Sequence, residues 1–176
     1  TAMVNEVWGD WGDKGPHTMM EDEHTLKGIV REKYPDLPYF LFGHSMGSML
    51  TRRYIQLYGD DLVGAVLSGS GVFSNGLLKL GTVVAASEIK RNGRAHPSLL
   101  LDKLVFQNFN RGFKPARTDL DWLSRDEAEV DKFLKDPLRG KIGSAGYFHD
   151  FFCGLLAMND AANIQSIPKD LPLHFI

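Results

Sequence analysis

The stretch that most constrains the fold of this chain is YFLFGHSMGSML, residues 39–50. Its first half is a continuous run of aromatic and aliphatic side chains, which predicts a strand over residues 38–43 that is buried on both faces. Its second half begins a helix predicted over residues 46–58. The next apolar run, residues 62–68, predicts a second strand. A strand, a helix and a second strand in tight succession predict a parallel sheet, so the fold class is α/β.

Ser45 lies between Gly43 and Gly47 at the junction of this strand and helix. A hydrolytic nucleophile is typically a serine on a sharp turn between a strand and a helix. The residues two before and two after it are then too close to their surroundings to carry side chains. The helix that follows directs its amino end at the site, where the backbone N–H of Met46 can bind a developing oxyanion. We therefore predict Ser45 as a nucleophile and the Met46 amide as an oxyanion donor.

Other polar residues fit these roles less well. Ser70 and Ser144 each lack one of the two flanking glycines. His44 is adjacent to Ser45, but a neighbouring residue on such a turn points elsewhere, so we expect His44 to pack and to form hydrogen bonds. His149 and Asp150 are consecutive on a predicted helix, where adjacent side chains do not face each other, so we do not expect them to act as a catalytic pair.

The segment before the first strand predicts a helix. TMME has the spacing of a capping box, so we expect the helix to begin after Thr18. Its periodicity places Leu26, Ile29 and Val30 on the buried side. After the second strand the pattern changes, because residues 74–168 show helical periodicity and no convincing strand.

Two helices stand out in that segment. One begins at a second capping box, formed by Ser124 and Glu127, and buries Val130, Phe133 and Leu134. The other covers residues 146–158 and has a wide apolar side. The closing residues, DLPLHFI, return to a strand pattern. We therefore predict three parts: a core segment over 1–71, a helical cap over 72–168 and a returning core strand over 169–176.

Composition excludes several function classes. A formal net charge of -2 gives no basic surface for nucleic acid. No apolar run approaches the roughly 18 residues of a membrane span, so no stable membrane insertion is expected. The first residues lack the pattern of a signal peptide. Cys153, the one cysteine, lies in an apolar run and is expected to be buried. A lone cysteine fits a reducing compartment, and we expect a cytoplasmic protein.

Three segments resemble a known family. FLFGHSMGSMLTRRYIQLYGDDLVGAVLSGSG, FKPARTDLDWLSRDEAEVDKFLKDP and IPKDLPLHFI are similar to the nucleophile segment, the cap and a core strand of monoacylglycerol lipase-like α/β-hydrolases. The bacterial members are often labelled lysophospholipases. The resemblance implies an α/β-hydrolase fold with an inserted cap, or lid, and a serine hydrolase of carboxylic esters. It implies no cofactor and no metal.

The resemblance also implies what should lie outside the chain. The family uses a serine, an aspartate and a histidine in that order, and the last two would follow Ile176. The second oxyanion donor would precede Thr1. We therefore expect a fragment that lacks both ends of the fold, and a chain that is inactive by itself although the intact protein is an enzyme.

The cap suggests the substrate. It is rich in aromatic and aliphatic side chains, and an apolar lid would suit the acyl chain of a monoacylglycerol or a lysophospholipid. We expect the pocket to be lined by Phe148, Phe152 and Leu155, although such side chains also serve to pack a cap onto its core. A small lipid-like ester is the expected partner, with transient membrane contact through the cap. The sequence does not indicate an oligomeric state.

Two alternatives remain. The same fold also serves serine aminopeptidases, and fold alone does not determine the chemistry. A catalytically inactive remnant or binding module would also fit, because the expected acid and histidine of the triad are not in the chain.

Overall fold

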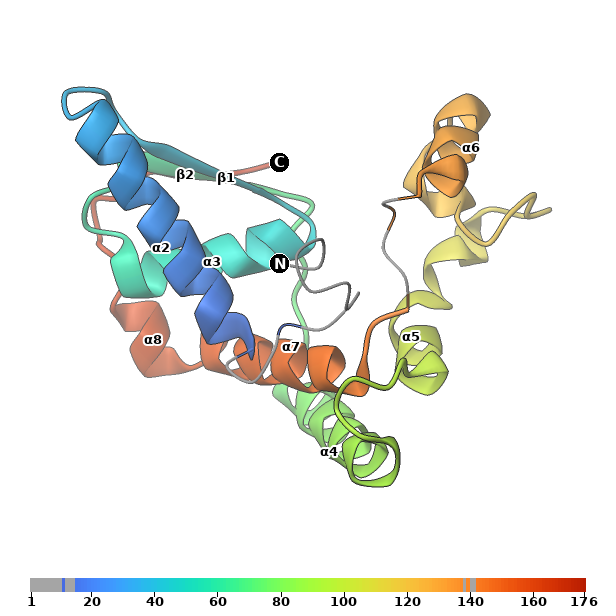
Figure 1. Cartoon of the computed structure of the whole chain (residues 1–176). Helices are drawn as coiled ribbons and strands as arrows, with labels where there is room; N and C mark the ends of the chain where they lie inside the picture. Colours follow the sequence, from blue (N-terminus) through green and yellow to red (C-terminus); the bar gives the residue numbers. More distant parts are fainter. Residues whose placement is uncertain (1–10, 12–14, 138, 140–141) are drawn as a thin grey trace. The chain divides into compact units, whose positions relative to one another are not determined.

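The computed structural model describes residues 11, 15–137, 139 and 142–176 (Figure 1). The chain divides into two compact units. One contains residues 11–83 and 149–176, and the other contains residues 84–148.

A parallel sheet organises the first unit. Its strands are β1 (Phe40–His44), β2 (Gly64–Ser68) and β3 (Leu173–Phe175), in the order β1-β2-β3. All pairs are parallel, and Phe42 lies opposite Val66, which in turn lies opposite His174. The parallel α/β arrangement and the returning strand are confirmed, and the structure places β1 two residues later than the predicted start.

The core covers one face of this sheet. Helices α2 (Gly15–Lys33) and α3 (Met46–Tyr58) lie side by side next to the strands (Figure 1). A buried cluster in this unit joins the two helices to β2 and the loop before it, through Met20, Tyr54, Ile55, Leu62 and Ala65.

The other face of the sheet is exposed among the described residues. Side chains alternate along a strand, so Phe40 and Phe42 point away from the face that carries Leu41. Their exposed fractions are 60% and 63%, whereas Leu41 packs against the core cluster. The prediction that this strand is buried on both faces is therefore wrong. A continuous apolar run cannot reveal whether anything covers its second face.

Helix α2 begins earlier than predicted. It starts at Gly15, so Thr18 lies inside the first turn rather than at a capping box. The buried side is also displaced, because Leu26 and Ile29 are more than half exposed while Met20 and Lys27 are only 3% exposed. The predicted stripe was wrong because this helix packs partly through polar groups.

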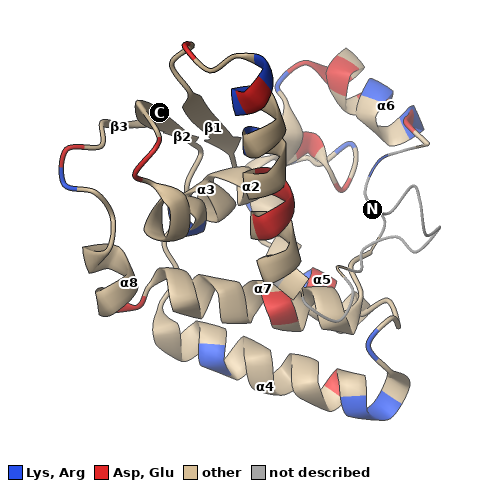
Figure 2. Cartoon of the chain, turned by 60° about the vertical axis from the view of Figure 1, so that its left-hand side comes forward, with Lys and Arg blue, Asp and Glu red and all other residues tan. Residues whose placement is uncertain are grey.

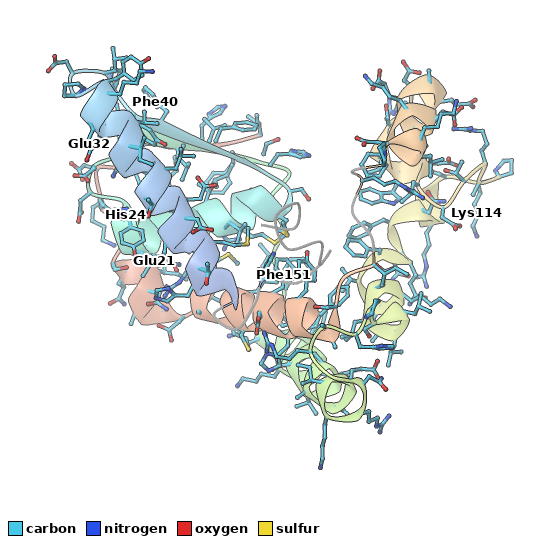
Figure 3. All side chains as sticks on the ribbon, viewed as in Figure 1. Glu21, His24, Glu32, Phe40, Lys114 and Phe151 are labelled. Atoms are coloured by element: carbon cyan, nitrogen blue, oxygen red, sulfur yellow. The ribbon has the colours of Figure 1, made fainter. Side chains whose placement is uncertain are left out.

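Polar contacts join α2 to α3 and to the loop after it. The His24 ring stacks on Tyr58 at 3.9 Å, and its Nδ1 lies 3.2 Å from the hydroxyl of Tyr54. The Lys27 ammonium donates to Asp61 at 3.0 Å. The Tyr58 hydroxyl donates to Glu21, which Figure 3 labels with His24 beside α2. Burial is the main cause that raises the pKa of Tyr54 to about 12.

The described residues between β2 and β3 contain helices and no strand. These are α4 (Asn75–Asn92), α5 (Leu99–Phe106), α6 (Glu127–Lys135), α7 (Ala145–Met158) and α8 (Ala161–Gln165), with short 3-10 turns η1 (Phe109–Gly112) and η2 (Asp121–Leu123). Val130 is buried as predicted, whereas Phe133 is 41% exposed, contrary to the prediction, and Leu134 is partly buried. The cap of α6 is Asp126, which accepts from the Ala128 amide, and Ser124 instead accepts from Asp126, so that capping box was assigned wrongly.

The division into a core segment, a cap and a returning strand stays a prediction. In the two compact units, residues 72–83 and 149–168 group with the sheet. The boundary falls inside α4 and α7, and sequence punctuation cannot mark a boundary within a continuous helix. Figure 2 shows how few charges α7 carries, Asp150 being its charged residue.

Two further observations concern solvent and membrane. Cys153 is exposed on α7, so the prediction of a buried cysteine is wrong. None of the described helices combines the length and apolar character needed to cross a bilayer.

Candidate active site

Ser45 occupies the turn between β1 and α3. Its φ is 52° and its ψ is -117°, and among the described residues it is the one non-glycine residue with positive φ. A side chain in this region costs on the order of 1–3 kcal/mol and persists only where the surroundings enforce it. β1 ends at His44 and α3 begins at Met46, so Ser45 is the single residue between the strand and the helix.

Backbone contacts on both sides hold this conformation. The Ser45 N–H donates to the carbonyl oxygen of Ser68 at 2.9 Å, which fastens the turn to the end of β2. The Ser45 carbonyl accepts from the Ser48 amide at 3.0 Å and from the Ser48 hydroxyl at 2.6 Å. Ser48 is fully buried. Sequence analysis missed this residue, because a serine inside a helix gives no distinctive sequence signal.

The two flanking glycines have different roles. A Cβ at Gly43 would collide with the carbonyl group of Gly47 and with the hydroxyl of Thr51. A Cβ at Gly47 would meet nothing within 4 Å. The close approach expected on both sides of Ser45 is therefore present at Gly43 alone, where the first turn of α3 passes over β1.

His44 is engaged elsewhere. Its Nδ1 lies 3.0 Å from the hydroxyl of Ser68, the residue opposite it on β2. The hydrogen-bonding role expected for His44 is thus confirmed. The Ser45 hydroxyl forms no hydrogen bond with any described residue, and Ser45 is exposed. The turn presents an accessible hydroxyl rather than one already paired with a base.

The amino end of α3 lies beside this hydroxyl. Met46 contributes the first amide of a 13-residue helix, whose aligned peptide dipoles make its amino end electropositive. An oxyanion formed on a carbonyl attacked by Ser45 would lie next to this end. The arrangement can therefore supply a nucleophile and one backbone oxyanion donor.

Arg52 on α3 supports the loop after β2. Its Nη1 donates to the carbonyl oxygen of Gly71 at 3.0 Å, and burial lowers the pKa of its guanidinium. Gly69, with φ of 58°, brings this loop against the His44 ring, 3.4 Å from where its Cβ would be. Arg52 on α3 thus holds the loop after β2, and this loop lies against His44, the residue before Ser45.

The rival residues are placed as follows. Ser144 is buried and accepts from the Tyr147 amide at 3.0 Å, so it caps α7. The Ser70 hydroxyl is buried and has no hydrogen-bond partner among the residues that the structure describes. His149 and Asp150 do meet, at 3.2 Å between Nδ1 and Oδ1, contrary to the expectation that adjacent helix residues stay apart. The described contacts do not join this pair to Ser45.

The three predicted lining residues occupy different surroundings. Phe148, 1% exposed, lines a cavity within residues 84–148. Phe152 is 9% exposed, and its ring lies 2.8 Å from where a Cβ of Gly81 would be. Leu155 is 3% exposed and lines a void of about 20 Å³, which is too small for a substrate. Burial of this kind favours packing for Phe152 and Leu155.

Comparison with known proteins follows this geometry. Residues 13–171 match the family described as serine aminopeptidase, S33. Monoglyceride lipase of Mus musculus is 26% identical over 147 residues, covering 84% of this chain and 42% of the relative. Monoacylglycerol lipase of Mycolicibacterium smegmatis is 29% identical over 125 residues, covering 70% of this chain and 39% of the relative.

A solved structure also resembles this chain. A thermostable carboxyl esterase from Bacillus coagulans matches with a TM-score of 0.86 and 34% identity, over 98% of this chain and 56% of that one. The chain thus spans about half the length, or less, of these relatives. The resemblance to monoacylglycerol lipase-like α/β-hydrolases is confirmed, and the chain belongs to the serine aminopeptidase S33 family of the α/β-hydrolase fold.

Proposed function

We propose that the whole protein is a serine hydrolase of carboxylic esters and that Ser45 is its nucleophile. One observation carries the proposal. Ser45 is held at positive φ between a parallel strand and the amino end of α3. No packing requirement explains a strained, exposed serine at that point, whereas presenting a nucleophile does.

The chemistry follows from the geometry. The Ser45 oxygen attacks the ester carbonyl carbon as its proton passes to a base, and the Met46 N–H stabilises the resulting oxyanion. The tetrahedral intermediate collapses, the C–O bond breaks, and the alcohol leaves with the proton returned by the base. Water then attacks the acyl-serine ester by the same route, which releases the acid and restores Ser45.

We assign the base to a histidine outside these 176 residues. The described His44 is occupied by Ser68, and no described residue forms a hydrogen bond with the Ser45 hydroxyl. We further assign the acid that orients the base and the second oxyanion donor to residues outside the chain. On this assignment the 176-residue chain alone reacts far more slowly than the whole protein.

Lipid-like acyl esters are the proposed substrates. The relatives bear the names monoglyceride lipase and carboxyl esterase. The name of the first of these relatives indicates a substrate with an apolar acyl chain. Monoacylglycerols and lysophospholipids share this chain and differ in the head group.

A serine aminopeptidase is the second candidate, because the matched family bears that description. The test compares the whole protein on a monoacylglycerol, a lysophospholipid and an aminoacyl p-nitroanilide, with Ser45→Ala as the control. We expect ester turnover that falls at least about 10³-fold in the variant. Preferred cleavage of the anilide would support the aminopeptidase. Absence of turnover by folded protein would support a binding module.

A further inference from the structure

We propose that the cavity within residues 84–148 binds a quaternary ammonium group carried on an apolar molecule. The cavity holds about 840 Å³, which is within the range of small-molecule sites. All of its lining residues belong to that one unit, on α5, η2, α6, the start of α7 and the segments between them. The proposal does not depend on the chemistry at Ser45.

Aromatic rings dominate the walls. The cavity is lined by Phe106, Trp122, Phe133, Tyr147 and Phe148. Trp122 is fixed in place, because its amide donates to the Asn110 side chain at 3.1 Å and its ring packs edge-on against Phe109 at 4.9 Å. The faces of such rings attract cations, by about 0.5–2 kcal/mol for each well-placed ring.

A carboxylate stands among these rings. Asp102 on α5 is half-buried and lines the cavity, and its carboxylate forms no hydrogen bond or ion pair with any described residue. Burial raises the pKa of this carboxyl group, and the nearby Asp102 charge contributes, after burial, to a raised pKa of the Tyr147 hydroxyl. A half-buried carboxylate without a partner is stabilised by any cation that enters. Asp119 and Lys103 also line the cavity, but both are exposed, where water screens them.

The hydrogen-bonding groups favour a quaternary over a primary ammonium. A primary ammonium needs three acceptors, whereas a quaternary one needs none. Of the two lining amides, Asn110 is already engaged, because its Oδ1 accepts from Trp122 and its Nδ2 donates to the Thr118 carbonyl at 2.7 Å, and Gln107 is exposed. The cavity therefore offers one half-buried carboxylate, that of Asp102, and several π faces, which match a trimethylammonium group.

The test titrates the full chain with choline, with its neutral isostere 3,3-dimethylbutan-1-ol and with ethanolamine, followed by the NMR shifts of the tryptophan indole N–H groups. We expect choline to bind at least about fivefold more tightly than the isostere, with the shift assigned to Trp122 by Trp122→Phe. Equal affinity for the two would overturn the proposal. Tighter binding of ethanolamine would also overturn it, in favour of a primary ammonium.

Matched variants identify the carboxylate. Asp102→Asn should weaken choline about fivefold or more and leave the neutral isostere unchanged. Asp22→Asn, which removes the same charge from an exposed position on α2, should change neither. An equal loss in both variants would mean that only net charge matters and would contradict the site. The wild-type comparison decides the question even if Asp102→Asn fails to fold.

Discussion

At the scale of single residues, the turn at Ser45 divides into a part that sequence could predict and a part that it could not. The spacing of Gly43, Ser45 and Gly47 identified the turn, because a strand-to-helix reversal needs a close backbone approach. The spacing could not predict which of the two glycines is in close contact with other backbone, since that depends on where the first turn of α3 passes over β1. Ser48, whose buried hydroxyl reaches the Ser45 carbonyl, carried no distinctive pattern.

The two glycines give a matched prediction. Gly43→Ala should lower the free energy of unfolding by about 1–3 kcal/mol, because the new Cβ meets the backbone of Gly47. Gly47→Ala should leave it unchanged or raise it by up to about 1 kcal/mol, because the site is open and helical. Urea unfolding of the three proteins measures both. Equal destabilisation would contradict the described approach.

Ser48→Ala tests what holds the turn. The variant loses one buried hydroxyl hydrogen bond, so we expect a loss of about 0.5–1.5 kcal/mol in the free energy of unfolding. Ser87→Ala on α4 serves as the control, because its hydroxyl forms no hydrogen bond with any described residue. An effect at Ser48 no larger than that at Ser87 would argue against the role of Ser48.

At the scale of elements, local signals located the strand–helix–strand unit well, and α3 has the predicted bounds. They failed at α2, where the buried side carries Met20, His24 and Lys27 rather than Leu26 and Ile29. Hydrophobic periodicity reports apolar packing only. Hydrophobic periodicity therefore cannot identify the buried side of a helix that packs through ring stacking and an ion pair.

The α2–α3 contact predicts a response to high pH. Tyr54 holds its proton more strongly when folded, with a pKa of about 12 against 10.0 for the free side chain. Its stabilising contribution is therefore complete below pH 10 and is lost as the pH rises from 10 toward 12. We expect Tyr54→Phe to show a flatter decline than wild type over this window, by chemical denaturation. The exposed Tyr34→Phe should keep the wild-type slope; if it flattens equally, Tyr54 is not responsible.

At the scale of the whole molecule, the sequence predicted an α/β-hydrolase fold. It did not predict which apolar surfaces are exposed to solvent in the described part of the chain. Phe40 and Phe42 on β1 and Ile176 at the end of β3 are at least 60% exposed. The apolar sequence around Phe40 and Phe42 would be the same whether or not another segment covered this face of the sheet. The cavity of residues 84–148 was equally beyond prediction, since it arises from segments far apart in sequence.

The open sheet face should bind a hydrophobic dye. We expect the chain to enhance the fluorescence of 8-anilinonaphthalene-1-sulfonate, and Phe40→Ser with Phe42→Ser to reduce that enhancement at unchanged far-UV circular dichroism. Val72→Ser, which removes an isolated side chain with 87% exposure, is the control. An unchanged signal in the double variant would place the dye elsewhere.

The most direct test of the central claim is fluorophosphonate labelling of the whole protein, read by intact mass and peptide mapping. Our account predicts one adduct, on Ser45, that is absent in Ser45→Ala and retained in Ser70→Ala. It also predicts that the 176-residue chain alone labels far more slowly. An adduct on another residue, or none on a folded whole protein, would contradict the assignment of Ser45 as the nucleophile.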